Sequence, residues 1–157
     1  MFKHLLIATD GSAASEKALV QGLLLAKALA AQVTVVTVTE PWTEGAYATI
    51  PTPSLIKAYE QAAAGGAASL LDGVSKVAEE AGVRCQTRHI KDQYPAEGII
   101  KAAKDQGCDL IIVGSHGRGA IGRVVLGSTS LKVLTFSPVA VLVGRKRQLA
   151  HAIDPAQ

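Results

Sequence analysis

Residues able to bind an anionic ligand are concentrated between Gly114 and Ser130, in the segment GSHGRGAIGRVVLGSTS. Its glycines let the backbone approach a ligand closely and adopt positive φ, which other residues resist. Gly127 and Ser128 stand where a helix is expected to begin. The free N–H groups and the dipole of a helix N-terminus attract anions such as phosphate. The segment therefore has the residue types of a phosphate-binding loop.

The charges around this segment favour the same chemistry. The chain has no acidic residue between Asp109 and Asp154, but it has six Lys or Arg there. A glycine-rich turn needed only for packing is the alternative. The stretch GRGAIG from Gly117 matches the dinucleotide pattern GxGxxG, but no Asp or Glu follows about 20 residues later to hold a ribose, which excludes NAD. The pattern GxxxxGK[ST] is absent, which excludes an ordinary P-loop NTPase.

A second candidate is Thr9-Asp10-Gly11, which follows a short apolar run. Asp10 could contact a ligand, or it could serve only the turn, since Asp-Gly is a common turn pair. His116 has no acidic neighbour in the sequence to orient it as a general base. We expect it to line the pocket or to form a local hydrogen bond.

Composition limits the class of protein. The 157 residues suit one domain, and 48% hydrophobic with 18% charged residues is typical of a globular chain. A net charge of +3 is too weak to indicate nucleic acid as a partner. Cys85 and Cys108 form no CxxC pair, so we expect reduced thiols and no metal site. We expect no signal peptide, because the first residues, MFKHLLIATDGS, lack a long apolar run and a cleavage site. No run approaches about 18 apolar residues, so we expect no membrane span and a cytoplasmic location.

The pattern of apolar residues predicts the elements that position these loops. Five short runs are expected strands: 5–8, 33–38, 83–90, 110–113 and 139–143. Four longer runs are expected helices: 13–31, 54–81, 95–106 and 128–135. We expect a long loop at residues 40–54 that is either a functional lid or locally disordered. We also expect Gly65 and Gly66 to weaken the second helix and the tail from Gln148 to be frayed.

The order βαβαβαβαβ predicts a parallel, doubly wound sheet with right-handed crossovers. Ligands of such sheets bind beyond the carboxyl ends of the strands, where the strand order reverses. If the first and fourth strands are neighbours, the loops at Asp10 and Gly114 face one crevice.

The segments ATDGSAASEKAL and VGSHGRGAIGRVVLGSTSLKVLTFSPVAVLV closely resemble the universal stress protein family, and the similarity runs from Phe2 to about Arg145. The ATP-binding pattern of that family, G-2x-G-9x-G-[ST], is complete at Gly114, Gly117, Gly127 and Ser128. The resemblance implies the ATP-binding branch. It also implies a Rossmann-like α/β domain over residues 1–147, with an open five-stranded parallel sheet in the order 3-2-1-4-5, helices on both faces and a short tail at 148–157.

The resemblance also implies a set of site residues. Asp10, beside Ala8 and Thr9, would contact the ribose or adenine end, and Val38 would meet the adenine. The ribose and phosphates would be wrapped by one run of seven residues: Gly114, Ser115, His116, Gly117, Arg118, Gly119 and Ala120. The phosphates would be held by a second run: Gly127, Ser128, Thr129 and Ser130. No catalytic residue is assigned, and Mg²⁺ or Mn²⁺ beside the phosphates is left open.

This chain departs from the family at one place. The usual Gly-Asp-Pro after the third strand is replaced by Lys91-Asp92-Gln93-Tyr94-Pro95, which leaves the shape of that rim open.

The resemblance implies a dimeric, ATP-binding regulatory factor of the stress response that acts through nucleotide-dependent conformation or through an unidentified protein partner. Pairing of the last strand, Val139 to Val143, would form the homodimer and cover an apolar edge. Two alternatives remain open. One is a slow ATPase or phosphotransferase, for which Asp10 and Asp92 are the obvious carboxylates. The other is a dimeric scaffold whose ATP is structural.

Overall fold

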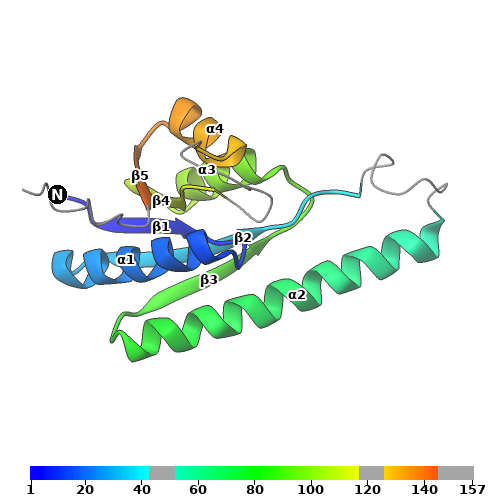
Figure 1. The fold of residues 1–157 in the computed structure, drawn as a ribbon, viewed down its shortest axis with the longest axis horizontal. Helices are drawn as coiled ribbons and strands as arrows, with labels where there is room; N and C mark the ends of the chain where they lie inside the picture. The colour runs from blue at the N-terminus through cyan, green and yellow to red at the C-terminus, as the bar shows by residue number, and fades with distance from the viewer. Residues whose placement is uncertain (43–51, 117–125, 145–157) are drawn as a thin grey trace, which may run out of the picture.

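The protein is a parallel sheet covered by helices on both faces, as Figure 1 shows for the computed structural model, which describes residues 1–42, 52–116 and 126–144. The strands are β1 (His4–Ala8), β2 (Gln32–Val38), β3 (Cys85–Ile90), β4 (Leu110–Gly114) and β5 (Ala140–Gly144). They pair in the order β3-β2-β1-β4-β5, all parallel. The expected strand order is confirmed, and β1 and β4 are neighbours.

The described helices are α1 (Ala13–Leu29), α2 (Pro53–Glu80), α3 (Pro95–Asp105) and α4 (Ser128–Phe136). In Figure 1, α1 and α2 cover one face of the sheet, and α3 and α4 cover the other. No helix of the described part of the chain is long and apolar enough to cross a membrane.

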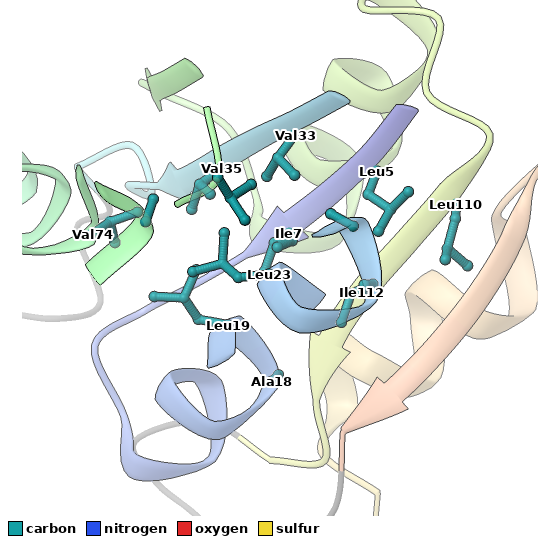
Figure 2. Packing of buried hydrophobic residues seen from close by; sticks show 13 residues of the cluster. Leu5, Ile7, Ala18, Leu19, Leu23, Val33, Val35, Val74, Leu110 and Ile112 are labelled. Atoms are coloured by element: carbon teal, nitrogen blue, oxygen red, sulfur yellow. The ribbon is translucent and has the colours of Figure 1, made fainter. Parts of the chain in front are cut away.

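Each face of the sheet has its own core, because successive side chains of a strand point to opposite faces. Leu5 and Ile7 of β1 pack with α1 and α2, as Figure 2 shows for Ile7 beside Leu19 and Leu23. Leu6 and Ala8 pack on the opposite face, against α3 and α4. Burial on both faces explains why the central strands are apolar throughout.

Several element boundaries differ from those expected, and a backbone conformation or a hydrogen bond explains three of them. The first helix stops at Leu29 and not at residue 31, because Ala30 adopts a left-handed conformation with φ 53°. The third strand starts at Cys85, because the N–H of Val83 caps α2 by donating to a helix carbonyl. The last strand starts at Ala140, because the N–H of Val139 donates to Ser137 Oγ at 3.1 Å.

The second helix is continuous over 28 residues and includes Gly65 and Gly66. It starts at Pro53, where Thr52 Oγ1 accepts a hydrogen bond from the N–H of Leu55 at 3.3 Å. Most of the expected loop at 40–54 and the whole expected tail from Gln148 lie outside the described residues.

One buried glycine allows α1 to lie close to the sheet. A Cβ atom on Gly22 would lie 2.7 Å from Ile7 Cδ1 and 3.0 Å from Ile112 Cδ1. Both isoleucines are fully buried, so they have no free space into which to move. Helix α1 can therefore approach β1 and β4 only if residue 22 has no side chain.

Substituting Gly22→Ala is expected to lower the free energy of unfolding by about 1 kcal/mol, because overpacking costs about 1–3 kcal/mol and helix propensity returns at most about 1 kcal/mol. The matched control is Gly73→Ala in α2, where a Cβ would have nothing within 4 Å. That control is expected to raise stability by about 0.4–1 kcal/mol. Urea unfolding measures both, and equal shifts for the two variants would contradict the packing argument.

Candidate functional site

A cavity of about 450 Å³ opens at the carboxyl edge of the sheet, where β1 and β4 lie side by side. Ten of the expected site residues line it: Ala8, Thr9, Asp10, Val38, Gly114, His116, Gly127, Ser128, Thr129 and Ser130. Gly117, Arg118, Gly119 and Ala120 lie outside the described residues. Ser115 is buried next to the cavity and does not line it. The structure thus brings the two predicted loops to one cavity.

The loop after β1 is held by a local hydrogen-bond network. The N–H of Thr9 donates to Val36 O at 2.9 Å, which continues the pairing with β2. Thr9 Oγ1 lies 3.0 Å from Ser15 Oγ, and both side chains are buried. Gly11 takes φ 75°, a conformation that favours glycine. These contacts fix the loop against the first turn of α1.

Asp10 serves the turn and also lines the cavity. Its Oδ1 accepts a hydrogen bond from the N–H of Ser12 at 2.9 Å. Burial alone would raise the pKa of the Asp10 carboxyl, but hydrogen bonds from Ser12 and Ser15 outweigh burial and hold the pKa below its ordinary value. The carboxylate is therefore ionised at neutral pH. Its oxygens can accept a hydrogen bond from a ligand hydroxyl, such as that of a ribose.

Gly114 is the point at which β4 meets α1. A Cβ atom there would lie 3.0 Å from both Ala14 C and Ser15 N, which are backbone atoms that no rotamer change can move. The carbonyl oxygen of Gly114 accepts a hydrogen bond from Ser130 Oγ at 2.6 Å. The N–H of Gly127 donates to Ser115 O at 2.8 Å. These contacts connect the end of β4 to both α1 and α4.

The first turn of α4 faces the cavity with Ser128, Thr129 and Ser130. Its N-cap, Gly127, has an extended conformation and forms no side-chain cap hydrogen bond. The N–H groups and dipole of such a helix start favour an anion. The single hydroxyl proton of Ser130 is used on Gly114, so this side chain connects α4 to β4, whereas Ser128 is exposed.

The cavity has an apolar end on the side of β2 and α3, where Val36, Val38 and Ile99 line it. Ala8 of β1 and Val113 of β4 are further apolar lining residues. A cavity that joins an apolar end to a helix N-terminus suits a ligand with an apolar ring system and an anionic group. Its volume lies within the range of about 300–1,000 Å³ that is typical of ligand pockets.

The rim after β3 is attached to the end of β2. Asp92 adopts φ 54°, and the N–H of Gln93 donates to Thr39 O at 3.3 Å. Pro95 begins α3 and lines the cavity. The departure from the family at residues 91–95 therefore still places a proline at this rim.

Ser115 and His116 form a second local pair. Ser115 Oγ lies 2.9 Å from His116 Nδ1, and His116 lines the cavity. This agrees with the expected local hydrogen bond of His116. The buried hydroxyl orients the imidazole ring, so that Nδ1 is occupied and Nε2 is the nitrogen left to meet a ligand.

Both cysteines are free, and neither lines this cavity. Burial and the nearby Asp109 raise the pKa of the Cys108 thiol to about 11, and burial raises that of Cys85. Across residues 1–42, 52–116 and 126–144, no three His, Cys, Asp or Glu are grouped so as to hold a metal ion.

Five lining residues were not expected from the sequence: Ser15, Val36, Pro95, Ile99 and Val113. Val36 and Val113 are strand residues next to expected ones. Pro95 and Ile99 are four residues apart, so they share one face of α3. Ser15 follows the N-cap Ser12 by three residues and lies in the first turn of α1. Helical spacing could have predicted that Pro95 and Ile99 share a face of α3. It could not have predicted that this face lines the cavity.

Comparison with known proteins gives consistent matches. The sequence model described as the Universal stress protein family matches residues 1–145. The universal stress protein YxiE of Bacillus subtilis is 32% identical over 155 residues, covering 92% of this chain and all of that protein. A putative universal stress protein of Staphylococcus epidermidis is 32% identical over 156 residues, covering 98% and 90%. The structure of UspA from Lactobacillus plantarum superposes with a TM-score of 0.75 at 26% identity, covering 91% and 97%.

Two more distant structures share the fold and are described with nucleotides. A universal stress protein in complex with cAMP has a TM-score of 0.69 at 24% identity, covering 92% and 97%. One from Archaeoglobus fulgidus in complex with dAMP has a TM-score of 0.58 at 14% identity, covering 92% and 98%. By fold, by family model and by sequence identity over nearly its whole length, this chain belongs to the universal stress protein family.

Proposed function

We propose that the protein binds ATP in the cavity between β1 and β4 and acts as a regulatory factor of the stress response. The proposal rests on one feature of the structure: the apolar end and the N-terminus of α4 line the same cavity. The adenine would lie against Val38 and Ile99, the ribose near Asp10, and the phosphates at Ser128 and Thr129. The complete pattern from Gly114 to Ser128 and the nucleotide complexes of two proteins of the same fold support this assignment.

Bound ATP would connect elements that are far apart in the sequence. The cavity is lined by the loop after β1, the start of α3 and the start of α4. A ligand that contacts all three would shift a conformational equilibrium by binding one arrangement of these elements more tightly than another. The conformation that ATP stabilises would then determine which protein partner binds. Free thiols at Cys85 and Cys108 support a reducing, cytoplasmic compartment.

We propose further that β5 forms a homodimer by pairing with its copy. Only β4 pairs with β5 among the described strands, so its other edge is free of sheet partners. Leu142 of β5 is 37% exposed, and Phe136 at the end of α4 is 70% exposed. An exposed apolar edge strand favours pairing with another chain.

The purified protein is expected to bind ATP and to release it on denaturation, as chromatography of the supernatant detects. Ser128→Glu places a carboxylate where the phosphates would lie, and we expect at least about tenfold weaker binding, because like charges about 4 Å apart repel by about 1–4 kcal/mol. The same carboxylate suits a helix N-terminus, so folding is preserved.

The matched control for that variant is Ser128→Gln, which has a similar size and no charge. It is expected to retain most of the affinity in isothermal titration calorimetry. Absence of ATP binding in the unmodified protein would mean that the glycine pattern serves packing only. Equal losses of ATP affinity in the two variants would mean that the phosphates do not lie at the start of α4.

A regulatory role predicts slow chemistry. We expect ATP turnover below about 1 s⁻¹, the lower limit of ordinary kinases. Phosphate release from protein saturated with ATP and Mg²⁺ measures it. Faster turnover that falls in an Asp10→Asn variant would favour the alternative of an ATPase or phosphotransferase.

The proposed dimer is tested by Leu142→Lys, since a lysine on an edge strand opposes strand pairing. Sedimentation velocity is expected to show a dimer for the unmodified protein and a monomer for this variant. Leu55→Lys is the control, because Leu55 is 38% exposed and belongs to α2, which packs on β2 and β3 at the opposite end of the strand order from β5. A dimer that persists in Leu142→Lys would place the interface elsewhere.

A further inference from the structure

Gly98 lies in a helix whose backbone does not require glycine. It is the fourth residue of α3, and its N–H donates to Tyr94 O at 2.9 Å. Among the glycines that the structure describes, Gly11, Gly82 and Gly107 have positive φ and Gly98 does not, so the conformation of Gly98 is one that alanine adopts equally well. Glycine inside a helix is less stable than alanine. The reason for glycine at this position must therefore lie in packing.

The packing neighbour of Gly98 is Val38 at the end of β2. A Cβ atom on Gly98 would lie 2.9 Å from Val38 Cγ1 and 3.2 Å from Val38 Cγ2. It would also lie 3.4 Å from Gln93 Cβ, which is an ordinary contact. Real Cβ atoms do not approach other atoms within 3.0 Å. An alanine at position 98 would therefore require Val38 or α3 to move.

Neither movement leaves the cavity unchanged. The backbone of Val38 is held in the sheet by its pairing with Ile90. Its β-branched side chain has few alternative rotamers. Val38 lines the cavity on one side, and Pro95 and Ile99 of α3 line it beside Val38. A shift of either wall changes the apolar end of the cavity.

The anion-binding end is held by separate contacts. Ser130 Oγ donates to Gly114 O at 2.6 Å, and the N–H of Gly127 donates to Ser115 O at 2.8 Å. These bonds attach α4 to β4 and do not involve Val38 or Gly98. A change at position 98 should thus act mainly where a base would lie.

We infer that Gly98 is a positioning residue: its missing side chain lets Val38 lie against α3 and leaves the apolar end of the cavity wide enough for a two-ring purine base. The inference rests on the proposed function, because the purine is that of the bound ATP. Gly98 lies outside the glycine pattern, and in this role it provides the space that the base needs.

A double-mutant cycle with ATP tests this inference on the whole protein. Gly98→Ala is expected to weaken ATP binding at least about fivefold. Val38→Ala removes both Cγ atoms that the new methyl group would meet. The double variant Gly98→Ala with Val38→Ala is then expected to bind ATP at least about fivefold more tightly than the product of the two single effects predicts. Calorimetric titration measures all four affinities.

Gly73→Ala, a glycine-to-alanine change in open space on α2, is the control and should leave ATP affinity unchanged. Thermal unfolding of each variant separates a loss of binding from a loss of folding. If Gly98→Ala alone does not fold, restoration of folding and ATP binding in the double variant supports the same contact. Independent, additive effects of the two substitutions would overturn the inference. A lack of ATP binding by the unmodified protein would instead overturn the proposed function on which it rests.

Discussion

At Gly114 the end of β4 lies directly against the backbone of α1, so close that even a methyl group would require that backbone to shift, and the carbonyl oxygen of the same residue accepts a hydrogen bond from Ser130 Oγ. This contact sets the distance between the loop after β1 and the start of α4. If residue 114 carried a side chain, the first turn of α1 would have to move away from β4, and the cavity between them would change shape. The relative placement of Asp10 and the start of α4 depends on this close approach.

The strand order provides the setting for that contact. The crossover from β3 through α3 to β4 passes over β2 and β1, so α1 and α4 cover opposite faces but begin at the same edge of the sheet. This is the reversal point at which ligands of open α/β sheets bind. The polar groups come from loops and helix starts, which can change without cost to the core, and the apolar wall comes from the strand ends. The core and the candidate site therefore impose separate requirements on the sequence.

Sequence alone located the polar part of the candidate site, because Asp10 and Gly127 each follow or precede an apolar run and carry turn or cap chemistry. It could not locate Ser15, Ile99 or Gly98, because their positions depend on how α1 and α3 pack on the sheet. Alternating apolar runs predicted five strands and four helices, but the strand order came from family resemblance. Boundary errors arose at caps such as Ala30, where one backbone conformation decides where a helix ends.

We expect one cavity to hold the base at Val38 and the phosphates at the start of α4, and a crystal structure of the protein grown with ATP would show whether it does. The adenine is expected to lie between Val38 and Ile99. Phosphate oxygens are expected within hydrogen-bond distance of the N–H groups of Ser128 and Thr129. ATP bound elsewhere would contradict this expectation, for example in the cavity lined by Lys27 and Arg84, residues near the opposite ends of the strands.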